Sequence, residues 1–224
     1  MAIKMEVTKA DLTVEAALPR PEFTLFRDAA ALLDCLYRRL EPYGLRLTDI
    51  RVERGAGNVG EQHFLLYLFN YWMTVRIRVE RVEVYCSDLP PGQFDRFKAA
   101  MLDVLGAVKD HRPDLSFRTF GIALEIHGRL EGQPVRDYLA RFATNNPTGL
   151  GPPSGSGVVF YFGPEGDRLL SAITADVSAV VSEGLYLRIH GVWDAGRVAP
   201  DALGGIAEGF VRQAIEGFGL QLPA

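Results

Sequence analysis

The sequence predicts an α+β fold: antiparallel sheets with helices packed on one face, built as two duplicated strand–turn–helix halves. Three observations support this prediction. Long stretches alternate apolar residues with period two, which is typical of half-buried strands. Other stretches repeat apolar residues at helical spacing and end at proline or glycine. A short segment also recurs later in the chain, followed each time by a turn and a helix.

The chain begins with a predicted strand and a predicted helix. Residues 6–18 alternate, with their apolar side chains on one face. Apolar residues then recur at helical spacing from Phe26 to Leu40, and Pro42 ends this helix. Residues 45–53 return to period two, so we expect a second strand there.

Residues 62–86 are strongly strand-like. Apolar side chains occupy every second position at Leu65, Tyr67, Phe69, Tyr71, Met73, Val75, Ile77 and Val79. A pleated strand puts all of them on one face, so we expect one very long strand or a hairpin that turns near Asn70. The other face is also apolar at Leu66 and Leu68. A strand apolar on both faces must be covered on both, by its own helices, a ligand or another chain.

The rest of the chain alternates between both patterns. We expect helices after Pro90 and Pro91, at residues 133–142 and at residues 200–218, and strands at residues 116–130, 158–162, 169–181 and 185–193. In the last helix, Gly205 and Gly209 lower helix propensity, so we expect them to pack closely against a sheet or a second subunit.

An internal repeat indicates the two halves. Leu124–Leu130 (LEIHGRL) aligns with Leu187–Trp193 (LRIHGVW). A turn and a helix follow each copy, which suggests duplication. We therefore expect halves at residues 1–112 and 113–224, or one continuous domain.

Three segments together resemble an uncharacterised, sporadically distributed bacterial protein family. They are Phe117–Leu130 (FRTFGIALEIHGRL), the helix Pro90–Val108 before it, and the strand and helix of Leu185–Phe210. The resemblance implies the α+β fold. It implies no activity, because the family is uncharacterised.

Composition narrows the class of protein. Hydrophobic residues make up 48% of the chain and charged residues 23%, which is typical of a domain with a core. The net charge of −4 does not favour nucleic-acid binding. Cys35 and Cys86 are too few for a disulfide framework or a four-cysteine zinc site. The longest apolar run, residues 63–75, is too short to span a membrane as a helix, and we expect a cytoplasmic protein of bacterial type.

Two histidines are candidate ligand-binding residues. His127 and His190 each end a strand before a glycine, with Glu125 and Arg188 two residues earlier on the same faces. Neutral imidazoles bind metals or relay protons, so this cluster is a candidate site. No zinc-binding spacing is present, and structural histidines remain the alternative. We predict no metal, no cofactor and no catalytic residue.

Aromatic residues near a group of arginines form a second candidate. Tyr71 and Trp72 lie beside arginines between residues 46 and 81, as in platforms that bind single-stranded nucleic acid. Glutamates interleave with these arginines, and cross-strand ion pairs would use the same residues. We keep Tyr71 and Trp72 as candidate ligand contacts and do not expect nucleic acid as the partner.

Two further segments have simple interpretations. Gly55–Gly60 matches G-x-G-x-x-G, but a strand rather than a helix follows it, so we expect a turn. Thr144–Gly157 has no periodicity and could be a lid, a partner-binding loop or a domain boundary.

These patterns favour a non-catalytic binding or assembly protein that forms a homo-oligomer. A protein that binds an apolar small molecule between sheet and helices is one alternative. An enzyme using the His127/His190 region is the other.

Overall fold

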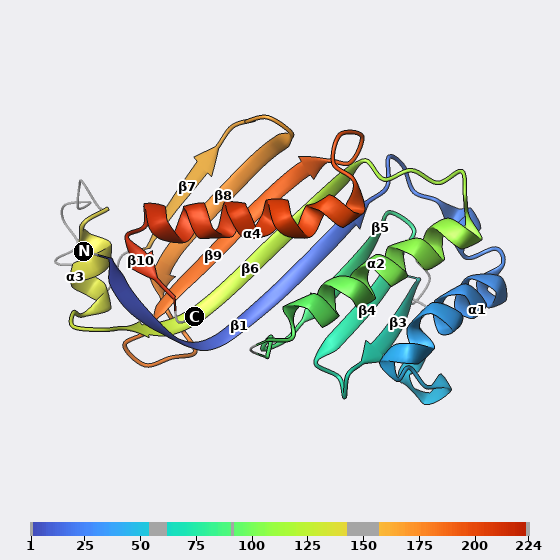
Figure 1. The fold of residues 1–224 in the computed structure, drawn as a ribbon, viewed down its shortest axis with the longest axis horizontal. Coiled ribbons are helices and arrows are strands. Elements are labelled where there is room, and N and C mark those ends of the chain that lie inside the picture. The colour runs from blue at the N-terminus through green and yellow to red at the C-terminus, as the bar shows by residue number, and fades with distance from the viewer. Residues whose placement is uncertain (1, 54–61, 91, 143–156, 223–224) are drawn as a thin grey trace. The chain divides into compact units, whose positions relative to one another are not determined.

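The computed structural model describes residues 2–53, 62–90, 92–142 and 157–222, which form an α+β fold with a large antiparallel sheet and four α-helices (Figure 1). The two segments singled out at residues 55–60 and 144–156 lie outside the described residues. The helices are α1 (Ala29–Leu40), α2 (Phe94–His111), α3 (Val135–Ala140) and α4 (Pro200–Gly217). The strands are β1 (Ile3–Ala17), β2 (Ile50–Glu53), β3 (His63–Leu68), β4 (Met73–Arg78), β5 (Arg81–Cys86), β6 (Thr119–Leu130), β7 (Val158–Phe162), β8 (Arg168–Val177), β9 (Leu185–Asp194) and β10 (Leu220–Gln221). None of the described helices is long and apolar enough to cross a membrane.

The chain divides into two compact units. Unit 1 comprises Met1–Asp11, Ala123–Val192 and Gly205–Ala224, and unit 2 comprises Leu12–Ile122 and Trp193–Gly204. The expected boundary after residue 112 falls inside unit 2, between α2 and β6. Each unit combines segments that are distant in the sequence. Periodicity along the chain does not show which segments come together.

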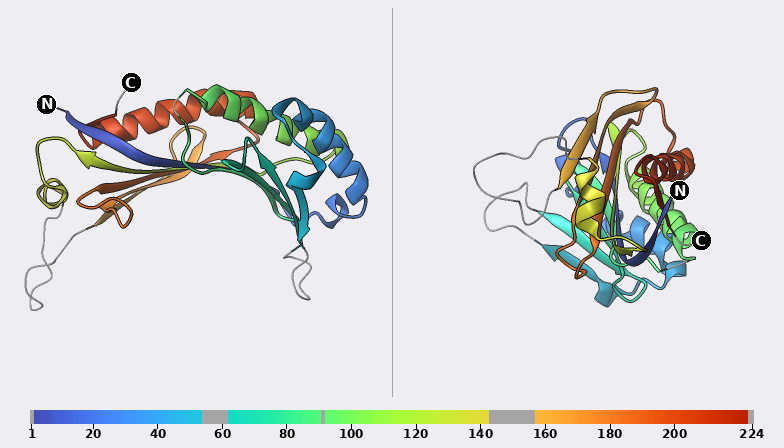
Figure 2. Two further views of the ribbon diagram at one scale, coloured as in Figure 1. Left: turned by 90° about the horizontal axis from the view of Figure 1, so that it is seen from below. Right: turned by 90° about the vertical axis from the view of Figure 1, so that its left-hand side faces the viewer.

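Unit 2 has a sheet covered by two helices. Its strand order is β2-β3-β4-β5-β1, with antiparallel neighbours. Helices α1 and α2 pack together over one face of these strands (Figure 2). Helix α1 buries Leu32, Leu36 and Leu40, which lie one above the other at i, i+4 spacing. The carboxylate of Asp28 caps this helix by accepting a hydrogen bond from the Ala31 N–H at 3.2 Å.

The strand-like segment at residues 62–86 is three strands. The expected turn near Asn70 is confirmed, and the alternative of one long strand is wrong. Phe69, Asn70 and Tyr71 all have positive φ, at 54°, 55° and 72°, which reverses the chain. A second turn at Val79 and Glu80 separates β4 from β5.

This turn also corrects the expected faces. Leu66 pairs with Val75, and Leu68 pairs with Met73, so these four apolar residues share one face. Residue Leu65 lies opposite Arg76 on the other face. The alternation from residue 65 to 79 therefore does not mark one face, because partners across the hairpin have opposite parity.

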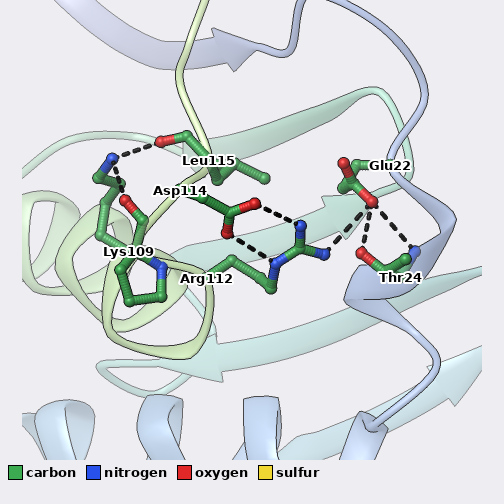
Figure 3. A network of polar contacts seen from close by, with 7 residues as sticks. Glu22, Thr24, Lys109, Arg112, Asp114 and Leu115 are labelled. Carbon is green, nitrogen blue, oxygen red and sulfur yellow. Dashed lines mark hydrogen bonds and ion pairs between the residues drawn. The ribbon is translucent and has the colours of Figure 1, made fainter.

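An ion-pair network ties two connections of unit 2 together (Figure 3). The Arg112 guanidinium donates to Asp114 at 3.0 and 2.9 Å and to Glu22 at 3.3 Å. Glu22 also accepts a hydrogen bond from the Thr24 hydroxyl. The Lys109 ammonium donates to backbone carbonyls of the α2–β6 connection. This connection is thereby fastened to the segment after β1.

Unit 1 has a sheet crossed by α4. Its strand order is β1-β6-β9-β8-β7, with β10 parallel to β1. Figure 1 shows α4 lying across the strands on one face. Strand β9 turns Leu185, Leu187 and Ile189 into the core with α4 residues Ala214 and Ile215. Since side chains alternate, the residues between them on β9 lie on the face away from α4.

The repeated segments lie on neighbouring strands. Leu124–Leu130 belongs to β6, and Leu187–Trp193 belongs to β9, which is adjacent to β6 in the sheet. All but Trp193 belong to unit 1. The two copies therefore do not correspond to two separate compact units.

The glycines of α4 differ from the expectation of close packing. A Cβ added at Gly205 or Gly209 would meet no atom within 4 Å, and both residues are exposed. The neighbouring Gly204 is the tight position, because its Cβ would lie 2.8 Å from the Lys98 side chain. Packing of Gly205 and Gly209 against the described part of the sheet is therefore wrong, and a second subunit remains the alternative.

Candidate functional site

An apolar cavity of about 540 Å³ lies in unit 1 between the C-terminal half of α4 and strands β7 and β8; we call it the α4–β8 pocket. Its volume is within the range of about 300–1,000 Å³ typical of small-molecule sites. The residues that line it are Phe142, Phe160, Phe162, Glu165, Arg168, Ser171, Ile173, Phe210, Gln213, Ala214, Gly217 and Phe218.

Strand register places the β7 and β8 side chains in this pocket. Phe160 pairs with Ile173, and Phe162 pairs with Ser171. Ile173 belongs to the same core as Ala214 and therefore faces α4. Residues opposite each other in an antiparallel pair share a face, so both phenylalanines also lie on the α4 side.

One end of the pocket is aromatic. The ring centroids of Phe142, Phe160 and Phe218 lie 5.1–6.3 Å apart, within the range of favourable aromatic pairs. Buried Tyr138 supports this group, because its hydroxyl donates to the Phe218 carbonyl at 2.8 Å. Burial raises the pKa of Tyr138 to about 12, so this hydroxyl remains a donor at neutral pH.

The other end of the pocket is polar. The Arg168 guanidinium lies over the Phe210 ring, 4.9 Å from its centroid, and pairs with the exposed carboxylate of Glu165. Ser171 lies between the two ends, paired with Phe162 and two residues from Ile173, and is 2% exposed. Among the described residues, neither Arg168 Nε nor Ser171 Oγ has a hydrogen-bond partner, although both atoms are buried.

The two ends are separated along both walls. On β8, Arg168 and Ile173 are five residues apart, which corresponds to about 16 Å along a strand. On the helix side, Phe210 and Phe218 are eight residues apart, or about 12 Å along an α-helix. Since Arg168 contacts Phe210, and Phe160 beside Ile173 contacts Phe218, the pocket is elongated with a polar and an aromatic end.

The structure brings two predicted site residues together on the other face of this sheet. Arg188 Nε lies 3.2 Å from the Glu125 carboxylate. Burial and the neighbouring Glu125 charge raise the pKa of Tyr186, which therefore remains protonated. Both members of the Glu125–Arg188 pair are more than a third exposed, so the pair contributes little to stability.

His127 is held by a serine. Its Nδ1 lies 2.8 Å from the Ser178 Oγ, and its ring packs against Tyr186 at 4.9 Å between centroids. The Ser178 oxygen accepts hydrogen bonds from the backbone N–H groups of Val180 and Val181. Its own proton can therefore be donated to Nδ1 in the tautomer that carries the ring proton on Nε2. This arrangement secures the turn after β8.

His190 lies on β9, on the same face as Arg188. Burial, together with the Arg188 charge, lowers its pKa below the ordinary value, so the ring is neutral at pH 7. Among the described residues, no group of three or more His, Cys, Asp or Glu side chains is arranged to hold a metal ion.

Tyr71 and Trp72 lie in unit 2, apart from the histidines in the compact-unit division. The Trp72 ring stacks on Phe69 with centroids 4.7 Å apart, and the Arg96 guanidinium lies 4.1 Å from the Phe69 centroid. Tyr71 packs against Tyr67 at 5.1 Å. Trp72 is thus used in packing the hairpin turn, whereas Tyr71 is 55% exposed.

Sequence reasoning missed the pocket residues. One available signal was Ser171, a serine on the core-facing side of β8 in line with Ile173 and Ala175. Another was Val158–Phe162, which is apolar on both faces as residues 64–68 are. Neither signal identifies the helix residues opposite, because those come from a distant part of the chain.

No family model matches this chain, and no curated protein matches it. The α4–β8 pocket is therefore identified as the candidate site from its geometry alone.

Proposed function

We propose that the protein is a non-catalytic binding protein that takes an apolar small molecule into the α4–β8 pocket. The observation that carries this proposal is the cavity of about 540 Å³ with aromatic walls. Burial of apolar ligand surface contributes roughly 25 cal/mol per Å². A ligand that covers the rings of Phe142, Phe160 and Phe210 buries apolar surface against each of them, and each buried surface adds to its binding free energy.

A pocket-filling substitution tests the proposal. N-phenyl-1-naphthylamine is a neutral apolar dye whose fluorescence rises in apolar surroundings, and we expect saturable binding of one dye per chain. Gly217 lines the pocket, and a Cβ there meets no atom within 4 Å. Gly217→Trp therefore fills the cavity without a backbone clash and should weaken dye binding at least about tenfold.

Gly209→Trp is the matched control. Gly209 is on the same helix and also has no atom within 4 Å of an added Cβ, but it does not line the pocket. Its dye affinity should equal that of the wild type. If circular dichroism shows that Gly217→Trp is folded and the variant still binds the dye with full affinity, the dye binds elsewhere and the proposal is wrong.

Self-association is a second candidate, favoured by strand β7. This strand pairs with β8, and within the described residues no other strand covers its outer edge. It has no charged residue, and its Val159 and Tyr161 side chains are 48% and 81% exposed. Uncharged exposed edges pair readily with another strand. Antiparallel pairing of β7 with β7 of a second copy is self-complementary about a two-fold axis.

Charges on this edge test self-association. Light scattering after gel filtration should give a mass at a multiple of 24.7 kDa for the wild type and 24.7 kDa for a Val159→Lys/Tyr161→Lys variant. Leu47→Lys changes an apolar residue of unit 2 that is 75% exposed and should leave the oligomer intact. A wild-type mass of 24.7 kDa at every concentration would rule this candidate out.

An enzyme that uses the His127/His190 region has less support, since Ser178 and Tyr186 hold the His127 ring in packing contacts. A cytoplasmic location, a bacterial origin, an internal duplication and a protein partner remain predictions from the sequence.

A further inference from the structure

We propose that a second copy of this chain completes the α4–β8 pocket, so that ligand binding and dimer formation strengthen each other. This inference rests on the proposed function and joins it to the self-association of β7. It comes from the position of β7, which is both a wall of the pocket and an edge of the sheet (Figure 1). Phe160 and Phe162 line the cavity, and the described part of the chain places no strand beyond them.

The pocket is incompletely closed at its β7 wall. Of the described apolar side chains that line it, only Phe160 and Phe162 are exposed, at 37% and 44%. Ile173 on the β8 wall and Phe218 after α4 are 5% and 7% exposed. Exposed rings lack part of the stabilisation that burial gives. A strand added beside β7 would cover them.

Strand β7 is complementary to a second copy of itself. A two-fold axis at Phe160 pairs all five residues of the strand in an antiparallel register. Val158 then lies opposite the partner subunit's Phe162, and Val159 opposite the partner subunit's Tyr161. Opposite residues share a face, with Cβ atoms about 4.5–5.5 Å apart. The partner subunit's Phe160 and Phe162 therefore extend the aromatic wall on the α4 side, next to the pocket.

Charge distinguishes β7 from the other terminal strand. Strand β2, at the opposite end of the described strand order, carries Arg51 and Glu53. Charged side chains on an edge strand discourage pairing with another chain. Strand β7 has no charged residue, and every pair that the two-fold register forms is apolar or aromatic. This contrast favours β7 as the edge that meets a second copy.

The apolar area at this edge suits a weak dimer. Phe160, Tyr161 and Phe162 are 37%, 81% and 44% exposed, or about one and a half rings per copy. At about 150–250 Å² for a whole aromatic side chain, two copies bring together roughly 500–800 Å². Stable interfaces bury about 1,000 Å² or more. Two empty copies therefore pair weakly, and a ligand that buries apolar surface against both of them strengthens the dimer.

Sedimentation velocity of the full chain, with and without saturating N-phenyl-1-naphthylamine, tests this coupling. We expect the dye to lower the dimer dissociation constant at least about fivefold. Because linkage is reciprocal, dye affinity should rise with protein concentration through the monomer–dimer transition. Gly217→Trp is the matched control: its cavity is filled, so its dimerisation should not respond to the dye.

Variants on the far face of β7 separate the interface from the pocket. Val159→Lys/Tyr161→Lys removes the dimer and changes no residue that lines the cavity. Its dye affinity should equal that of the dilute wild-type monomer, at least about fivefold weaker than that of the dimer. Leu47→Lys, in unit 2, should keep both the dimer and its dye affinity. Full affinity in the monomeric variant would contradict a shared pocket.

The outcomes separate this inference from the proposed function. If Gly217→Trp weakens dye binding but saturating dye leaves the wild-type dimer dissociation constant unchanged, or leaves the wild type monomeric, the inference is wrong and the proposed function stands. If the dye strengthens the Gly217→Trp dimer as much as the wild-type dimer, it acts outside the pocket and the inference is overturned. If no dye binds, both fall.

Discussion

Two buried serines of unit 1 differ in what their hydroxyls do. Ser178 Oγ bonds His127 and accepts from two backbone N–H groups, whereas Ser171 Oγ has no partner in the described residues. A satisfied buried hydroxyl stabilises a fold, and an unsatisfied one destabilises it. The contrast separates a hydroxyl that stabilises the fold from one that costs it free energy.

Alanine at each position should therefore have opposite effects. Ser178→Ala leaves His127 and two N–H groups without a partner and should cost about 1–3 kcal/mol in urea unfolding. Ser171→Ala removes an unsatisfied group and should be neutral or stabilising by up to about 1 kcal/mol. Equal losses in the two variants would contradict this assignment.

The Arg112 network should make stability depend on pH. The Thr24 hydroxyl and Arg112 lower the pKa of Glu22, and the Arg112 hydrogen bonds lower the pKa of Asp114. Carboxyls with a lowered folded-state pKa stabilise the protein above their ordinary value of about 4, and this contribution is lost as the pH falls through the folded pKa.

Arg112→Met should thus be less stable than the wild type at pH 7, and the difference should shrink in acid, as the pH falls below the ordinary carboxyl pKa of about 4 and Glu22 and Asp114 take up protons. Urea unfolding at both pH values measures it. Arg38→Met, which removes an exposed pair with Asp34, provides the comparison. A difference that stays constant with pH would mean that Arg112 acts through packing.

Strand β6 contains two glycines with different surroundings. A Cβ on Gly128 would lie 2.3 Å from the backbone oxygen of Glu6, so side-chain movement cannot relieve the contact. A Cβ on Gly121 would lie 3.7 Å from the Glu15 Cβ, which is ordinary van der Waals contact. The glycine after His127 is therefore required because the β1 backbone lies against it.

Substitution along β6 should follow this geometry. Gly128→Ala should destabilise the protein by about 1–3 kcal/mol or more, because the backbone of β1 must move. Gly121→Ala should be neutral or slightly stabilising, since it restricts the unfolded chain. Thermal unfolding by circular dichroism compares the two, and a tolerated Gly128→Ala would show that the strands separate easily.

Across the entire chain, ligand binding should protect only part of the backbone. The pocket belongs to unit 1, and neither α1 nor α2 lines it. When the free ligand concentration is 100 times the dissociation constant, binding raises the free energy of unfolding by about 2.7 kcal/mol. Protection should therefore concentrate where the ligand binds.

Hydrogen exchange with saturating N-phenyl-1-naphthylamine checks this expectation. Exchange should slow in β7, β8 and the C-terminal half of α4, and it should be unchanged in α1 and α2. The Gly217→Trp protein should show no slowing. Slowing confined to α1 and α2 would locate the dye in unit 2.

Much of the element list was predictable because periodicity is local. Alternation and helical spacing identified β1, β6, β9, α1, α2 and α4 to within a few residues. At residues 65–79 they left a long strand and a hairpin near Asn70 both open, because the alternation continues unbroken through the turn in which consecutive positive φ angles reverse the chain. Pattern alone cannot distinguish a long strand from a hairpin when the turn residues are apolar too.

One part of the candidate site was likewise predictable from the sequence, and another part was not. Glu125 and Arg188 could be expected to meet, because similar positions on two similar strands came to lie on one face of neighbouring strands. The α4–β8 pocket could not be expected, because it needs β7, β8 and the end of α4 in contact, and their side chains are ordinary apolar residues in isolation.

Local patterns of polarity thus determined the class of fold and most helices and strands, because each pattern depends only on the residues within one segment. Packing set which strands are neighbours, which residues share a face, and which buried donors have no partner. These properties depend on contacts between distant segments such as residues 168–173 and 210–218. The free energy of such contacts is decided by complementary shape and by hydrogen-bond partners, which no segment carries by itself.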